Sequence, residues 1–191
     1  MRRSRPTTHV LVVCTGNICR SPAAEVLLAH ALGPGVSVRS AGTQAVVGAP
    51  VEPAMAALLA ADGLDAGGFR ARQLHRDQIE EAHVILAMTR QHRSRVVSEA
   101  PGALRRTFTL RELVRLAGST DIAGATPLAG STPGARLQEL TPLALRARPR
   151  LRVPVEEDDV QDPYGRSAAV YASSYATIRE ACRRLADVLT G

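Results

Sequence analysis

The stretch VVCTGNICRSPAAEV, residues 12–26, decides the fold, because it joins an apolar run to a helix-forming run through a loop with two cysteines and an arginine. The short apolar run at residues 9–13 is rich in β-branched side chains and predicts a buried strand that ends at Cys14. After the loop, Ser21 suits the N-cap of a helix and Pro22 suits its first position. A loop held between a strand end and a helix N-terminus gathers free backbone N–H groups, which predicts an anion-binding site.

Strand-like and helix-like segments alternate along the rest of the chain. The pattern indicates an α/β fold, in which a small four-stranded parallel sheet is covered by helices on both faces. Ligands of such sheets bind beyond the carboxyl ends of the strands, where Cys14 falls. The expected strands are 9–13, 36–40, 83–88 and 106–109, and the expected helices are one that starts near Ser21 and Pro22, then 52–62, 77–82, 89–99, 110–117, 135–146 and 166–189.

The composition bounds the domain organisation. The chain has 191 residues and is 45% hydrophobic, which predicts one folded domain over residues 1–191. Residues 118–150 break the alternation with a loop rich in Gly, Ser, Thr and Pro, so we interpret them as an insertion within that domain. The acidic run at residues 156–159 is expected to be a solvated stretch of charge.

The net charge of +6 and the pI of about 10.2 do not by themselves predict a nucleic-acid partner. All 24 basic residues are arginine, as a bias in base composition would produce, and only 3% of the residues are aromatic, which leaves few rings for bases to stack on. The apolar part of the N-terminal segment is about five residues long, shorter than a secretory signal needs, and no segment has the apolar length of a membrane span. We therefore expect a cytoplasmic protein with no nucleic-acid or membrane partner.

The three cysteines and five histidines show no pattern of a disulfide framework or a metal site. Cys14 and Cys19 lack the C-x2-C spacing of zinc sites, and no two histidines form an H-x-x-x-H pair. Cys182 falls on the apolar stripe of the last expected helix and should be a buried core thiol. We expect no metal or cofactor, and reduced thiols fit a cytoplasmic protein. The histidines, interpreted as core or surface packing residues, are His9, His30, His75, His83 and His92.

The spacing of Cys14, Arg20 and Ser21 meets the needs of phosphate transfer. A thiolate is a good nucleophile, and a helix N-terminus and an arginine both stabilise it. Arg20 can hold two phosphate oxygens at once, and Ser21 can donate to the thiolate. Gly16 lets the backbone approach the phosphate, while Asn17 tolerates a left-handed turn. The loop is not a Walker nucleotide loop, because no lysine follows the glycine.

A cysteine nucleophile needs a proton donor for the leaving oxygen, and residues 160–165 supply one. Pro163 and Gly165 predict a turn that projects Asp162 outward, beside the ring of Tyr164. Asp162 is therefore the candidate general acid.

The sequence resembles a low-molecular-weight protein tyrosine phosphatase of the bacterial type, with an insertion before residues 160–165, the acid loop. The family's fold, a small central parallel sheet flanked by helices, agrees with the fold predicted above. The resemblance implies a metal-free phosphatase that acts on a phosphotyrosine protein or a small aryl phosphate through a phosphocysteine intermediate, with inorganic phosphate as product and inhibitor. The segments that carry the resemblance, in the family's order, are residues 14–22, 40–43, 72–74 and 162–165.

The resemblance also implies a role for each site residue. It makes Cys14 the nucleophile, Arg20 the phosphate clamp and Asp162 the general acid and then the general base. It makes Cys19 the neighbour that traps oxidised Cys14 in a disulfide, so that the enzyme is redox-sensitive. Asn17, Ser21 and Ser40 are implied as hydrogen-bonding support of the loop. The residues expected to bind the substrate or to support its loop are Thr15, Gly16, Asn17, Ile18, Cys19, Ser21, Ser40 and Tyr164.

Three departures from the family pattern leave the specificity for tyrosine open. Many members have serine and histidine where residues 68–69 are glycine and phenylalanine, so a histidine that helps to hold the loop asparagine is missing. Residues 88–89 are methionine and threonine instead of methionine and aspartate, and residues 44–48 lack the aromatic residue that often forms a wall of the site. Tyr164 is the ring that remains to stack on a substrate phenyl group.

Two other functions share parts of this pattern. An arsenate reductase-like thiol enzyme would use the same anion loop, but it needs further cysteines near residues 85–95, where this sequence has none. A basic anion-binding module without turnover would need neither a nucleophile nor an acid, whereas Cys14, Arg20 and Asp162 are all present. The sequence leaves the oligomeric state open.

Overall fold

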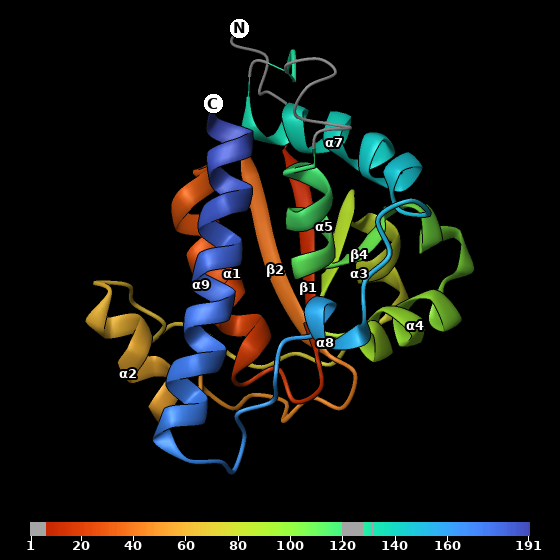
Figure 1. Cartoon of the computed structure of the whole chain (residues 1–191). Coiled ribbons are helices and arrows are strands. Elements are labelled where there is room, and N and C mark those ends of the chain that lie inside the picture. The colour runs from red at the N-terminus through yellow and green to blue at the C-terminus, as the bar shows by residue number, and fades with distance from the viewer. Residues whose placement is uncertain (1–6, 120–127, 131) are drawn as a thin grey trace, which may run out of the picture.

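A four-stranded parallel sheet lies at the centre of the molecule (Figure 1). The structure, a computed structural model, describes residues 7–119, 128–130 and 132–191. The strand that precedes the cysteine loop pairs with a neighbour on each side, and the predicted fold class is confirmed. In spatial order the strands are β2 (Val36–Gly42), β1 (Thr8–Cys14), β3 (Val84–Ala87) and β4 (Thr107–Thr109).

Helices connect these strands, as the alternation predicted. Each predicted strand and helix is present, with ends that differ from the predicted ones by no more than two residues. Among the described residues, two short elements, a 3-10 helix and a single helical turn, were not predicted. The helical elements are α1 (Arg20–Leu32), α2 (Pro53–Ala61), α3 (Arg76–Glu81), α4 (Arg90–Glu99), η1 (Pro101–Arg106), α5 (Leu110–Ala117), α7 (Pro133–Ala147), α8 (Val155–Asp158) and α9 (Ala168–Thr190).

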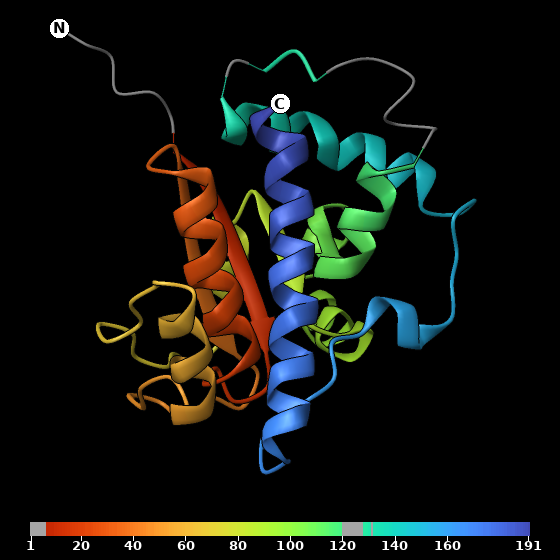
Figure 2. The same ribbon diagram turned by 60° about the vertical axis from the view of Figure 1, so that its left-hand side comes forward.

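Alternate side chains of β1 build two apolar cores, one on each face of the sheet. Val10 and Val12 belong to the larger core, together with buried residues of α1, α5 and α9. Leu11 and Val13 belong to a smaller core with residues of α3 and α4. Figure 2 shows α1 and α9 side by side along the sheet, in agreement with their extensive contacts. Because both faces are covered, β1 must be apolar on both sides, which is why it reads as a continuous apolar run.

The last helix, α9, carries the predicted apolar stripe. Tyr171, Tyr175 and Ile178 are buried on it, and Cys182 is 2% exposed, so the prediction of a core thiol is confirmed. α9 has 23 residues, yet across the described ranges no helix combines the length and the apolar character needed to cross a membrane.

The segment interpreted as an insertion is only partly described. Within the segment 118–150, residues 120–127 and 131 lie outside the described residues, as do residues 1–6 at the N-terminus. The helix expected at 135–146 is α7, which packs against α5 and α9.

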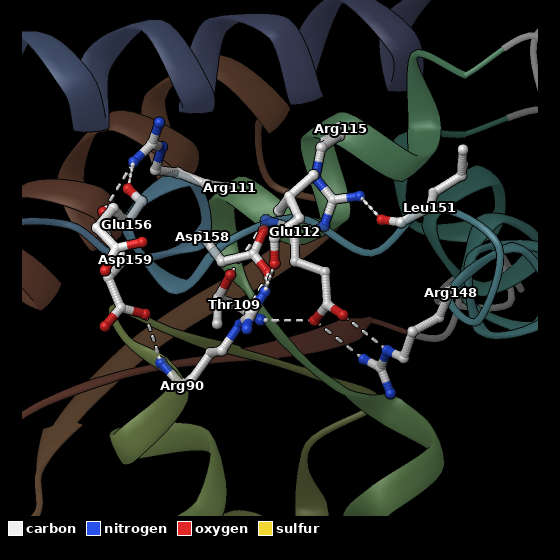
Figure 3. A network of polar contacts seen from close by, with 11 residues as sticks. Arg90, Thr109, Arg111, Glu112, Arg115, Arg148, Leu151, Glu156, Asp158 and Asp159 are labelled. Atoms are coloured by element: carbon white, nitrogen blue, oxygen red, sulfur yellow. Dashed lines mark hydrogen bonds and ion pairs between the residues drawn. The ribbon is translucent and has the colours of Figure 1, made fainter.

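The prediction that the acidic run 156–159 is solvated is wrong for its second half. Asp158 is 2% exposed at the end of α8 and forms ion pairs with Arg90 at 2.6 Å and Arg115 at 2.9 Å (Figure 3). The Asp159 carboxylate accepts the backbone N–H of Arg90 at 2.7 Å. Two guanidinium groups compensate the burial of the Asp158 charge, so the run anchors the segment that leads to Asp162.

Asp158→Asn should lower the free energy of unfolding by about 2 to 3 kcal/mol, because it leaves two partly buried guanidinium groups without their carboxylate. Urea unfolding measures the change. Asp187→Asn removes an exposed carboxylate from its pair with Arg183 and is the matched control, expected to unfold like the wild type. Equal midpoints for the two variants would contradict the anchoring role of Asp158.

Candidate active site

A pocket of about 210 Å³ opens at the carboxyl end of β1, at the lower end of the sheet in Figure 1. The loop between β1 and α1 forms its floor, and two later segments add walls through Gln44, Val46, Asp162 and Tyr164. The predicted residues that line it are Cys14, Thr15, Gly16, Ile18, Cys19, Arg20, Asp162 and Tyr164.

Hydrogen bonds to the backbone behind the loop direct the loop carbonyl groups away from the pocket. The carbonyl oxygens of Cys14, Thr15 and Gly16 accept hydrogen bonds of 2.9 to 3.0 Å from backbone N–H groups within residues 43–46. This close approach needs a glycine at Gly42, where a Cβ atom would lie 2.4 Å from the Thr15 carbonyl oxygen. Because the C=O and N–H of a peptide group point in opposite directions, the N–H groups of the loop face the pocket, as an anion site requires.

Asn17 holds the turn of the loop from the protein core. It is fully buried, and its φ of 54° lies in the left-handed region, as predicted for this asparagine. Its amide nitrogen donates to the hydroxyl groups of Ser21 at 2.9 Å and Ser40 at 2.8 Å, and its amide oxygen accepts the backbone N–H of Arg72 at 2.8 Å. Asn17, Ser21 and Ser40 therefore lie behind the loop and do not line the pocket.

Glu25 and Arg72 form a further layer behind Ser40. The Ser40 hydroxyl donates to Glu25 Oε2 at 2.6 Å, and Arg72 Nη2 donates to both Glu25 oxygens at 2.7 and 3.0 Å. Charge-assisted bonds of this kind are about twice as strong as neutral ones. Glu25 was not predicted as a site residue, although its i+4 spacing from Ser21 places the two residues on one face of α1.

Phe69 occupies the place where a histidine was expected to help hold Asn17. The Phe69 ring is buried, and the guanidinium carbon of Arg72 lies 5.5 Å from its centroid. The backbone N–H of Arg72 bonds the Asn17 amide oxygen, so the amide keeps a donor on this side without the histidine.

Cys14 ends β1, and its buried sulfur lies 2.9 Å from the Ser21 hydroxyl. The prediction that Ser21 is the N-cap is wrong, because α1 begins at Arg20 and Cys19 is the N-cap without a side-chain cap. The Ser21 hydroxyl is engaged elsewhere: it accepts a hydrogen bond from Asn17, which leaves its own hydrogen free for the Cys14 sulfur. It is thus placed to stabilise a Cys14 thiolate.

Arg20 joins the floor of the pocket to the acid loop. Its guanidinium group is buried, donates to Asp162 Oδ2 at 2.5 Å and donates to the Val160 carbonyl at 3.3 Å. The Asp162 side chain is half-exposed at the mouth, and its other oxygen accepts the Tyr164 backbone N–H at 3.2 Å. Val160 itself donates its N–H to the Met88 carbonyl at 2.8 Å, which ties the acid loop to the end of β3.

His92 contacts the loop from α4, and this contact was not predicted. Its Nε2 lies 2.8 Å from the Thr15 hydroxyl, and its Nδ1 lies 2.8 Å from the hydroxyl of Thr89, the N-cap of α4. Burial, reinforced by the charge of Arg20 and opposed by that of Asp162, lowers the pKa of His92 to about 4. The imidazole is therefore neutral at physiological pH. The sequence offered one signal, the placement of His92 just after a predicted strand end.

Cys19, the second loop cysteine, is a free thiol like Cys14. Burial raises the pKa of Cys19 to about 12, a hydrogen bond from Tyr171 works against this rise, and the charge of Glu52 adds to it. Cys19 is therefore a neutral thiol at physiological pH. Its expected disulfide with Cys14 stays a prediction.

Comparison with known proteins agrees with this geometry. The sequence model of the family described as Low molecular weight phosphotyrosine protein phosphatase matches residues 9–141. The chain belongs to this family. It is therefore a phosphatase, and the predicted family and enzyme class are confirmed. The family match ends before Asp162, whose placement rests on the contacts described above.

Two relatives and one solved structure bear on the specificity of this phosphatase. EpsP of Ralstonia nicotianae, described as a probable low molecular weight protein-tyrosine-phosphatase, is 41% identical over 104 residues, which are 54% of this chain and 71% of EpsP. A protein-arginine-phosphatase of Geobacillus stearothermophilus is 41% identical over 106 residues, which are 56% of this chain and 71% of the relative. The structure of the YwlE arginine phosphatase from the same organism matches with a TM-score of 0.71 at 30% identity, over 96% of this chain and 93% of that one.

The neutral His92 gives a pH dependence of stability with a defined sign. An unfolded histidine takes up a proton near pH 6.5, whereas His92 in the fold does so only near pH 4, so stability falls as the pH drops through this window. Between pH 7 and pH 5, the wild type should lose about 2 kcal/mol more unfolding free energy than His92→Asn. His30→Asn, on an exposed side chain, is the matched control and should follow the wild type. Parallel pH curves for the wild type and His92→Asn would contradict a neutral, loop-bound His92.

Proposed function

We propose that this phosphatase hydrolyses aryl phosphate monoesters, phosphotyrosine in proteins above all, and that Cys14 carries the phosphoryl group. The observation that supports this most is the convergence of three groups on one pocket. The Cys14 sulfur lies on the floor beside Ser21, and Arg20 pairs with Asp162 above it. A nucleophile, a clamp for phosphate oxygens and an acid at the mouth are the parts that a two-step phosphoryl transfer needs.

In the first step, the Cys14 thiolate attacks phosphorus in line, the bond to the leaving oxygen breaks, and Asp162 gives that oxygen its proton. The loop N–H groups and Arg20 hold the three remaining phosphate oxygens. In the second step, the Asp162 carboxylate takes a proton from water, the water oxygen attacks phosphorus, the P–S bond breaks, and inorganic phosphate leaves with the Cys14 thiolate restored.

The three free cysteines suit a reducing compartment, which supports a cytoplasmic phosphotyrosine protein as substrate. The packing of α7 on α5 and α9 supports a single phosphatase domain in which residues 118–150 are an insertion.

Cys14→Ser should abolish the release of 4-nitrophenol from 4-nitrophenyl phosphate while orthophosphate still binds, because Arg20 and the loop N–H groups remain. Steady-state absorbance and calorimetry measure the two properties. Cys182→Ala removes a thiol from the core and is the control that should keep turnover. A residual rate above a few per cent in Cys14→Ser would rule out the covalent step.

Asp162→Asn should slow poor leaving groups far more than activated ones, since only the former need a proton. We expect kcat/KM to fall by roughly a hundredfold or more for phenyl phosphate and by about tenfold or less for 4-nitrophenyl phosphate. Glu157→Gln, which removes an exposed carboxylate from the same segment, should change neither. Equal losses of kcat/KM for the two substrates would show that another residue is the general acid.

Phosphoarginine is the second candidate substrate, because one relative and one solved structure are named arginine phosphatases. The pocket walls favour an aryl group, since Ile18 and Val46 are apolar and Tyr164, which is 63% exposed, lies at the mouth. A neutral phenyl ring loses less solvation in such surroundings than a guanidinium group does. A peptide with phosphotyrosine should therefore be hydrolysed with the higher kcat/KM.

Tyr164→Ala should raise KM for aryl phosphates by roughly threefold to tenfold, since a ring contact contributes about 0.5 to 1.5 kcal/mol. Tyr164→Phe keeps the ring and should match the wild type. The ratio of kcat/KM for aryl phosphates to kcat/KM for alkyl phosphates shows whether Tyr164 contacts the substrate ring or only packs against the protein. An unchanged aryl-to-alkyl ratio in Tyr164→Ala would exclude the wall, and a preference for the phosphoarginine peptide would overturn the aryl specificity.

A further inference from the structure

An arginine-lined hollow of about 350 Å³ lies between α4, α5 and the segment that follows α7, and it shares no lining residue with the catalytic pocket. Figure 3 shows most of its charged side chains around Asp158 and Glu112. Five guanidinium groups line the hollow. They belong to Arg90, Arg93, Arg115, Arg148 and Arg152.

Two carboxylates in the lining compensate part of these five positive charges. Asp158 forms ion pairs with Arg90 and Arg115, and Glu112 forms one with Arg148. The two carboxylate oxygens of Glu112 lie 2.8 and 3.1 Å from the Arg148 guanidinium group. The lining thus keeps an excess of three positive charges. A folded protein bears such self-repulsion at a cost in stability, which a bound anion would offset.

The surplus charge is concentrated rather than spread. Arg93 Nε and Arg148 Nη2 both donate to the Thr107 carbonyl oxygen, at 3.3 and 2.8 Å, so two guanidinium groups share one neutral acceptor. Burial lowers the pKa of Arg148, Glu112 works against this fall, and the nearby positive charge of Arg93 adds to it. Within the part of the chain that the structure describes, Arg115 Nε is buried without a hydrogen-bond partner.

We propose that this hollow binds a diphosphate group, either as free pyrophosphate or as part of a nucleotide. Guanidinium groups match phosphate oxygens in geometry as well as in charge, because each can donate two parallel hydrogen bonds. A diphosphate carries about three negative charges near neutral pH, equal to the surplus, and it has oxygens enough for Arg93 and Arg152 together. The volume lies within the range of small-molecule sites. This site is independent of the proposed catalytic function.

The test is a calorimetric titration of the full chain with pyrophosphate, in the presence of saturating phenylphosphonate, which is added as a phosphate-ester analogue to fill the catalytic pocket. One pyrophosphate should bind per chain. Arg93→Gln combined with Arg152→Gln should weaken it by tenfold or more, while orthophosphate binds more weakly than pyrophosphate to the wild type. ADP in place of pyrophosphate identifies the source: tighter binding points to a nucleotide, and equal binding points to free diphosphate.

Arg95→Gln combined with Arg105→Gln removes the same charge from exposed side chains outside the hollow and should keep the wild-type affinity within about twofold. Circular dichroism checks that each variant is folded, and Arg152→Gln alone, at an exposed residue, serves if the double variant does not fold. Three results would each overturn the proposal: no binding to the phenylphosphonate-saturated protein, equal losses in the two double variants, or orthophosphate binding as tightly as pyrophosphate.

Discussion

The buried amide of Asn17 is the contact on which the rest of the site depends. The left-handed backbone at this residue costs about 1 kcal/mol, and each of its three hydrogen bonds, to Ser21, Ser40 and Arg72, returns about as much. The turn therefore forms without an anion to induce it. Once the turn is set, the carbonyl groups of Cys14, Thr15 and Gly16 bond away from the pocket and the N–H groups of these peptide units point toward it, so the anion site is organised before a substrate arrives.

Charge pairing then places the acid above this site. Arg20 bonds both the Val160 carbonyl and the Asp162 carboxylate, while the preceding residues are tied to α4 through Asp158 and Asp159. The acid loop is thus fixed at its start and left half-exposed at its tip. Such an arrangement keeps Asp162 within reach of a leaving group and of water, which both proposed steps require.

The sequence predicted those features that depend on local patterning. Strand and helix ends were predicted to within two residues, and the left-handed Asn17 and the core thiol Cys182 were found as expected. The placement of Cys14, Arg20 and Asp162 at one pocket also agrees with the prediction, which was made from motif spacing and turn residues that act within a few positions of the chain.

The features that the sequence did not predict depend on contacts between distant segments. Ser21 was expected to cap α1, yet its hydroxyl forms hydrogen bonds with Asn17 and Cys14 instead. The burial of Asp158 depends on two arginines that lie 43 and 68 residues away, and the contact between His92 and Thr15 spans 77 residues. The periodicity of the sequence does not predict such pairs, because the fold determines which distant residues come close enough to form ion pairs and hydrogen bonds.

A crystal structure of the protein with orthovanadate shows whether Cys14 bonds the group that is transferred. We expect a vanadium atom bonded to the Cys14 sulfur, with its equatorial oxygens on the loop N–H groups and Arg20, and with Asp162 at the apical oxygen. Vanadate bound with no bond to Cys14, or Asp162 turned away from the apical oxygen, would contradict the proposed mechanism.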